Sequence, residues 1–183
     1  MISAICLISF GLILVGAGLT FNGLISAKNA VKNAFTQIDV QLKRRHDLVP
    51  NLIAAVKGYM AHESEVLEKL TKARTLAQEA SSSSDRIEQE KGLSQAIGKV
   101  MMVAESYPDL KASQNFQALQ EELVSTENRI AFARQFYNDC VMAYDTCRQG
   151  FPGMLLAGNV RFPDEPYWKI DAAEQRDPIK VEF

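Results

Sequence analysis

The sequence predicts an all-α protein in which an N-terminal transmembrane helix is followed by a long antiparallel helical bundle. Three observations predict it: an uncharged run opens the chain, apolar residues later recur at spacings of three and four, and the six prolines gather toward the C-terminal end. No segment alternates polar and apolar residues for long enough to build a sheet. We therefore expect an anchor over residues 1–25 and one helical-bundle domain over residues 26–183, with a proline-containing segment from residue 151.

The anchor is predicted by the 24 uncharged residues from Ile2 to Ile25. A helix of about 20 apolar residues, rising 1.5 Å per residue, crosses the hydrocarbon core of a bilayer. The alternative is a cleavable signal peptide, since Val15-Gly16-Ala17 resembles a cleavage site. No Lys or Arg precedes the apolar run, as a secretory signal normally requires, so an uncleaved single-pass anchor is favoured.

The positive charges nearest to the anchor all follow it. Lys28 and Lys32 come first, and the basic run of residues 43–45 lies farther on. Because basic residues favour the cytoplasmic side of a membrane, we expect the bundle to face the cytoplasm.

The apolar side chains between residues 24 and 48 predict a first bundle helix that continues directly from the anchor. They form one helical stripe: Leu24, Ala27, Val31, Phe35, Ile38 and Leu42. Pro50 disfavours helical geometry at the residue before it, so we expect a turn at residues 46–49. A second helix is predicted from Leu52 to Ala77, with a kink or weak point at Gly58 and residues 62–64.

A third helix is predicted after the polar run of residues 81–85. Asp85 is the expected N-cap, because Glu88 stands three residues later as in a capping box. The helix is expected to end near Glu105, and a turn is expected at residues 107–109.

The fourth helix, from Asn115 to Gln149, has the most regular pattern. Its apolar positions alternate three and four, as in left-handed packing of long helices: Phe116, Leu119, Leu123, Thr126, Ile130, Ala133, Tyr137, Cys140, Tyr144, Cys147 and Phe151. Gly150 and Pro152 end it. Short helices are expected at residues 153–158 and 171–176 and an extended tail at 179–183, with Tyr167 and Trp168 pinning this segment to the bundle.

Side chains that carry chemistry are sparse, and we expect no catalytic, metal-binding or cofactor-binding site and no enzyme. His62-Glu63 begins like a zinc helix, but Val66 stands where the second histidine should be. His62 and His46 are therefore expected at the surface or in caps. Cys140 and Cys147 lie about 10 Å apart along one helix, too far for a disulfide. A net charge of -2 argues against nucleic acid as a partner.

The most unusual local feature is the charged patch Lys43, Arg44, Arg45 and Asp47. Three interpretations stay open: ion pairs within the bundle, a docking site for a protein, or a site for lipid headgroups. Distance disfavours lipid, because a straight helix puts Arg44 about 30 Å beyond the membrane edge. The acids expected as ion-pair partners are Glu121, Glu122, Glu127 and Asp139.

The chain resembles the LemA family of bacterial membrane-anchored helical proteins from about residue 21 to its end. The resemblance rests on these ordered segments: QIDVQLKRR (37–45), DLVPNL (47–52), VKGY (56–59), HE (62–63), YPDLKA (107–112), ENRIA (127–131), YND (137–139), FP (151–152) and PIKVEF (178–183). Phe21 and Phe35 depart from the tyrosine and tryptophan usual in the family. The resemblance implies a short anchor in the bacterial inner membrane and a long antiparallel bundle, without an assigned activity.

Two functions remain as hypotheses. The first is a membrane-anchored scaffold or adaptor that recruits an unidentified protein, and the alternative is a lipid- or peptide-binding module that uses a groove of the bundle. A scaffold should expose a patch of apolar or aromatic side chains. A groove binder should show an apolar pocket with converging polar groups. Homo-oligomerisation is left open by the sequence.

Overall fold

The computed structural model describes residues 2–60, 62–158 and 162–168, and within them every regular element is a helix. The helices are, in order, α1 (Ile2–Lys57), α2 (Ser64–Glu79), α3 (Ser83–Ala104), α4 (Pro108–Lys111), α5 (Gln114–Gln149) and α6 (Gly153–Ala157). The all-α fold class is confirmed, with a long apolar N-terminal helix leading into a helical bundle.

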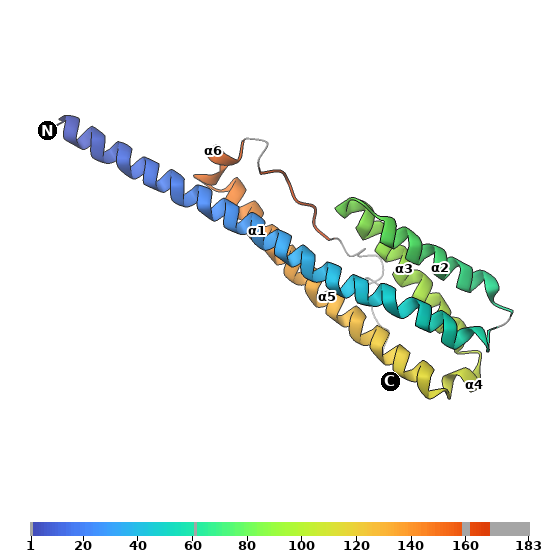
Figure 1. Ribbon diagram of the computed structural model, residues 1–183. Helices are drawn as coiled ribbons and strands as arrows, with labels where there is room; N and C mark the ends of the chain where they lie inside the picture. Colours follow the sequence, from blue (N-terminus) through green and yellow to red (C-terminus); the bar gives the residue numbers. More distant parts are fainter. Residues whose placement is uncertain (1, 61, 159–161, 169–183) are drawn as a thin grey trace, which may run out of the picture.

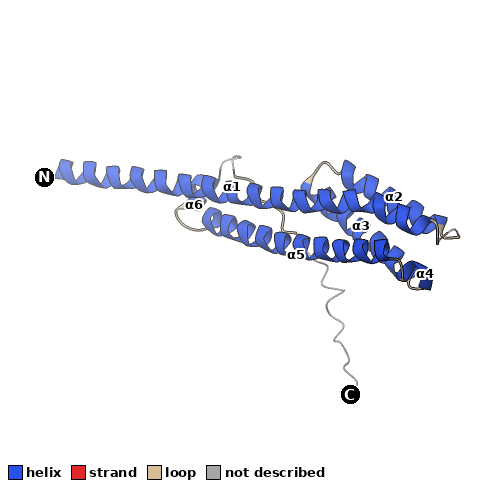
Figure 2. Cartoon of the chain, turned by 60° about the horizontal axis from the view of Figure 1, so that its bottom comes forward, coloured by secondary structure: helices blue, strands red, loops and turns tan. Residues whose placement is uncertain are grey.

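The bundle is built on two long antiparallel helices. α5 runs back along the second half of α1, and the α2–α3 hairpin packs against this pair at the end of the molecule remote from the N-terminus (Figure 1). The first part of α1 projects beyond the bundle without a neighbouring helix (Figure 2).

α1 is the one helix in the described part of the chain that is long and apolar enough to cross a membrane. Large apolar side chains are exposed along its first turns: Ile5, Leu7, Ile8, Phe10, Leu12, Ile13, Leu14, Val15 and Leu19. The first fully buried side chain of α1 is Leu24. The bundle therefore begins where the uncharged run ends.

The turn predicted at residues 46–49 is wrong, because α1 continues through Pro50 to Lys57. Proline lacks an N–H, so the carbonyl oxygen of His46, four residues earlier, loses its usual helical donor. Nε of Arg74, from α2, donates a hydrogen bond to that oxygen at 2.8 Å. A side chain from a neighbouring helix thus satisfies the group that Pro50 leaves free. The second helix predicted from Leu52 to Ala77 is therefore wrong as a single element, because residues 52–57 end α1 and α2 begins only at Ser64. The break between the two helices falls where Gly58 and residues 62–64 predicted a weak point.

Two apolar cores lie one after the other along the bundle. The core nearer the N-terminus joins α1, α5 and the C-terminal segment: Leu24, Val31, Ala34, Ile38, Leu42, Ile130, Tyr137, Val141, Tyr144, Phe162 and Trp168. The remote core is built from residues of all five helices from α1 through α5, together with Met60 after α1. Its buried members are Val49, Leu52, Val56, Met60, Leu70, Ala77, Leu93, Val100, Ala104, Leu110, Phe116 and Leu123. Between the two, the stripes of α1 and α5 carry polar residues, and these form the site described below.

α5 is unbroken, as predicted, but its buried stripe differs at the C-terminal end. Val141 is fully buried, whereas Cys147 and Phe151, which were placed on the stripe, are exposed. A straight helix drifts by about 20° per heptad relative to a strict seven-residue repeat, so a stripe extended over five heptads leaves the core.

α3 ends at Ala104, close to the predicted Glu105, but its start and the segment after it differ from the prediction. The N-cap of α3 is Ser82, whose Oγ accepts a hydrogen bond from the backbone N–H of Asp85 at 3.1 Å. The turn expected at residues 107–109 is the start of α4, with Pro108 in the first helical position, where a missing N–H costs nothing.

The segment after α6 is held against α5 by hydrogen bonds to its backbone, and Trp168 is buried as expected. Asn138 donates to the carbonyl oxygen of Trp168 at 3.0 Å and accepts from its N–H at 2.9 Å. The hydroxyls of Tyr137 and Tyr144 donate to the carbonyls of Pro166 and Pro163, both at 2.9 Å. Burial, reinforced by the charge of Glu165, raises the pKa of Tyr137 to about 12, so this donor keeps its proton. The helix predicted at 171–176 and the tail at 179–183 lie outside the described residues.

We expect Arg74→Met to lower the free energy of unfolding by about 1–2 kcal/mol, because the carbonyl of His46 loses its donor at a partly buried position. In a Pro50→Ala background the cost should be smaller, since the alanine supplies the missing backbone N–H. Chemical denaturation of the four proteins of this cycle, in the same detergent, measures the difference. An equal cost of Arg74→Met in both backgrounds would contradict the proposed role of Arg74.

Candidate functional site

A buried layer of charged side chains separates the two apolar cores. Arg45 of α1 is 1% exposed and Glu90 of α3 is 0% exposed. Nη2 of Arg45 donates a hydrogen bond to the carboxylate of Glu90. Nη1 donates two further hydrogen bonds, both 2.7 Å long, to Glu127 Oε2 of α5 and to Ser94 Oγ of α3. One guanidinium therefore joins α1, α3 and α5.

His46 completes this layer from α1. Its Nε2 lies 2.7 Å from Glu90 Oε1, and because an ionised carboxylate can only accept, Nε2 carries the proton of this hydrogen bond. The expectation that both histidines lie at the surface or in caps is wrong for His46, which is buried, whereas His62 is exposed.

The environment of Glu90 keeps its carboxylate ionised. Burial alone would raise the pKa of Glu90, but the hydrogen bond from His46 and the charge of Arg45 outweigh it and hold the pKa below its usual value. Nearby, burial lowers the pKa of Arg134, against the charge of Glu127, which raises it. The Arg134 guanidinium lies 5.0 Å from the ring centre of Trp168, so it links the charged layer to the C-terminal segment.

The structure divides the predicted patch of Lys43, Arg44, Arg45 and Asp47. Arg45 points into the bundle. Arg44 pairs at the surface with Glu122 of α5, with Nε donating to Oε1 at 2.8 Å. Lys43 and Asp47 are exposed. Successive helical residues point about 100° apart, so four neighbouring side chains do not share one surface.

Two of the four acids expected as partners, Glu122 and Glu127, do pair with this segment, but sequence reasoning missed Glu90. A signal for it was present. Glu90 lies on the apolar stripe of α3, which continues through Leu93, Ile97, Val100 and Ala104 at spacings of three and four. A charged residue on such a stripe is buried and needs a partner.

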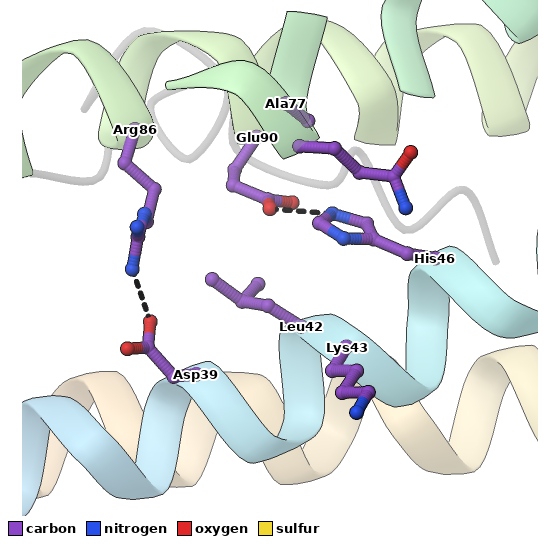
Figure 3. Close-up of a pocket in the computed structure, with 8 residues that line it drawn as sticks. Asp39, Leu42, Lys43, His46, Ala77, Arg86 and Glu90 are labelled. Carbon is purple, nitrogen blue, oxygen red and sulfur yellow. Dashed lines mark hydrogen bonds and ion pairs between the residues drawn. The ribbon is translucent and has the colours of Figure 1, made fainter. Parts of the chain in front are cut away.

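A cleft of about 280 Å³ opens beside the charged layer (Figure 3). Its lining comes from α1, α2 and α3: Asp39, Leu42, Lys43, His46, Ala77, Gln78, Arg86 and Glu90. Arg86 points at Asp39, 2.5 Å away, and Glu90 points at His46 (Figure 3). The lining holds no Ser, Thr or Cys nucleophile, and no metal-binding group of three His, Cys, Asp or Glu occurs among the described residues. Its charged groups act mainly on one another.

A second candidate site lies on the other side of the α1–α5 pair. We call it the α1/α5 face and define it by four exposed apolar side chains: Val40, Val124, Phe132 and Phe136. At about 100° per residue, Val40 points about 160° away from Leu42 and about 120° away from His46, which line the cleft toward the α2–α3 hairpin. Phe132 is 73% exposed. Shallow clefts of about 470 and 550 Å³ flank Arg129 and Phe132 on this face.

The sequence is similar to a known protein family and to several known bacterial proteins. The model of the LemA family matches residues 34–183. The chain is 26% identical to Protein LemA of Metamycoplasma hominis over 126 residues, covering 68% of this chain and 58% of the relative. It is 22% identical to magnetosome protein MamQ 2 of Paramagnetospirillum magneticum over 175 residues, covering 81% and 64%. Magnetosome protein MamQ of Magnetospirillum gryphiswaldense is 21% identical over 182 residues, covering 85% and 66%. The chain thus spans about three fifths to two thirds of these relatives.

Removing the central guanidinium should be far more costly than removing its neighbour. We expect Arg45→Ala to lower the free energy of unfolding by about 3 kcal/mol, because Glu90 is left charged and buried without its partner. The matched control Arg44→Ala removes an exposed pair and should cost less than about 1 kcal/mol.

Chemical denaturation at neutral pH measures both variants. At about pH 4 the cost of Arg45→Ala should shrink, because loss of the Arg45 charge raises the pKa of the buried Glu90 carboxyl, which then takes up a proton at a higher pH than in the parent. Similar costs for the two variants would show that the buried pair does not dominate the stability of the bundle.

Proposed function

The chain belongs to the LemA family, and from that premise we propose that it is a membrane-anchored helical scaffold or adaptor that recruits another protein through the α1/α5 face. Membership follows from the match of the family model to residues 34–183. Two features support the proposal. The N-terminal part of α1 is apolar enough to cross a bilayer, and the rest of α1 belongs to a bundle that exposes the apolar α1/α5 face.

The α1/α5 face is the observation that supports recruitment most strongly. Phe132 and Phe136 are one helical turn apart on α5. Both are exposed, whereas Ile130 and Tyr137 in the same stretch of α5 are buried in the core. Contiguous exposed apolar side chains commonly mark protein–protein contacts. Arg129 lies one turn before Phe132, and aromatic and arginine side chains together are typical of the energetically dominant part of such contacts.

The alternative function, a lipid- or peptide-binding module, is favoured by one feature of the same face. The cleft of about 470 Å³ between α1 and α5 is lined by Gln41, whose Oε1 is buried and accepts no hydrogen bond from the described residues. An unsatisfied buried oxygen could accept one from a bound ligand. We rank this second, because the cleft offers few other converging polar groups.

We further propose that α1 is a single-pass anchor in the bacterial inner membrane, with the bundle in the cytoplasm. The exposed apolar side chains before Leu24 support the anchor, since such a surface is unfavourable in water. Lys28 and Lys32, which follow the span, support the orientation.

We propose no catalytic role and no cofactor for this chain. The names of the relatives are not those of enzymes. In addition, the carboxylate and imidazole of the buried layer are engaged in ion pairs and hydrogen bonds with one another. The observations that support the proposal concern surfaces rather than reacting groups.

Recruitment is tested with the double variant Phe132→Ser, Phe136→Ser, which makes the α1/α5 face polar. We expect proteins crosslinked to the parent chain in intact membranes, and identified by mass spectrometry, to be lost from the double variant. Met102→Ser is the matched control, because Met102 of α3 is as exposed as Phe132 but lies on another helix. Unchanged crosslinking in the double variant would refute the scaffold role of this face, and loss of a crosslink to a second copy alone would identify a homo-oligomer.

Orientation is tested by fusing reporters after Phe183. A fluorescent protein that folds only in the cytoplasm should be bright at this position, whereas alkaline phosphatase should be inactive there. Active phosphatase would reverse the proposed orientation while leaving the anchor intact.

A further inference from the structure

A second exposed apolar surface lies at the end of the bundle nearest the N-terminus. It consists of Phe151, Met154 and Leu155, and we call it the α6 surface. Phe151, in the turn that follows α5, is 82% exposed, and Leu155, in α6, is 69% exposed. The turn into α6 is the part of the bundle that reaches farthest toward the N-terminal end of α1 (Figure 2).

Contacts with α1 fix the level of this surface along the molecule. Leu156 packs against the same core as Leu24 of α1. Phe162, which follows α6, meets Phe21 edge to face with ring centres 5.8 Å apart, and Nζ of Lys28 lies 5.8 Å from the centre of the same ring. α6 therefore lies beside residues 21–28 of α1.

The edge of the bilayer must fall at that same level if α1 is the anchor. The uncharged run extends from Ile2 to Ile25, and a hydrocarbon core takes up about 20 helical residues. Wherever 20 residues are placed within this run, the end nearer the bundle falls between Phe21 and Ile25. The α6 surface is thus held at the boundary between hydrocarbon and headgroups.

We propose that Phe151, Met154 and Leu155 insert into the interfacial layer of the bilayer that α1 crosses. The proposal rests on the membrane anchor of the proposed function and not on the scaffold role. Aromatic and large aliphatic side chains favour this layer, because their apolar bodies leave water while the neighbouring backbone stays near polar headgroups. A second contact beside the span would restrain the angle between the bundle and the membrane more than a single helix crossing does.

The test uses the full chain with Leu155→Trp, reconstituted in phosphatidylcholine vesicles whose acyl chains carry bromine. Bromine quenches tryptophan on contact. If the side chain enters the layer by about 5–10 Å, we expect its emission to fall about twofold relative to vesicles without bromine. The native Trp168 gives a small background, because it is buried and packs near Phe35, about 15 Å along α1 from Ile25.

The matched control is Phe132→Trp, an equally exposed position far from the predicted membrane edge, which should not be quenched. Circular dichroism establishes that both variants keep the helical content of the parent. Unquenched, red-shifted emission from Leu155→Trp would overturn the proposal by placing this side chain in water. Unquenched, blue-shifted emission would overturn it by showing that protein, from a partner or a second copy, covers the surface.

The same vesicles separate this proposal from the others. Extraction with alkaline carbonate tests the anchor, and release of the chain would overturn both the anchor and the α6 contact. Retention of the chain without quenching overturns the α6 contact alone. Crosslinking through the α1/α5 face is measured independently, so loss of the scaffold role leaves the quenching result unaffected.

Discussion

The pairing of the buried Arg45 guanidinium with the buried Glu90 and the half-exposed Glu127 is the constraint on which the arrangement of the bundle depends. Apolar side chains on either side of it tolerate sliding, because one leucine can replace another in a packed stripe. A buried guanidinium does not, since a slip of one helical turn, about 5.4 Å, would separate it from its carboxylates. The charged layer therefore sets the register of α1 against α3 and α5, and the two cores fill the space that this register leaves.

That register has effects at both ends of the molecule. It holds α5 so that its C-terminal end, and α6 after it, reach the level of Phe21. It also leaves Phe132 and Phe136 exposed beside clefts that are lined by residues of α1 and α5. The surfaces that support the proposed membrane and protein contacts are thus consequences of one polar layer. Arg134, between Glu127 and Trp168, extends the layer toward the C-terminal segment.

Periodicity predicted α3, α5 and the buried faces of α1 and α2, because burial of a stripe is recorded locally in the sequence, but it did not predict where α1 ends or that α4 is helical. Arg45 and Glu90 could also be recognised as charges on apolar stripes, but which charges meet depends on how separate helices pack. Pro50 shows the same limit: its local geometry predicts a turn, and the group that prevents it, Arg74, lies 28 residues from the carbonyl it contacts. The drift of the α5 stripe toward Val141 comes from the helical pitch, which a strict heptad reading ignores.

The uninterrupted course of α1 has a mechanical consequence. Since the same helix would cross the bilayer and form the bundle core, no hinge would separate them, and the bundle would act as a rigid spacer. Its tip, at Lys57, would stand about 48 Å from Ile25 along the helix axis. A tilt of about 20°, common for membrane helices, would swing that tip sideways by about 16 Å. Changes in bilayer thickness that alter the tilt would therefore be converted into lateral movement at the far end of the rod.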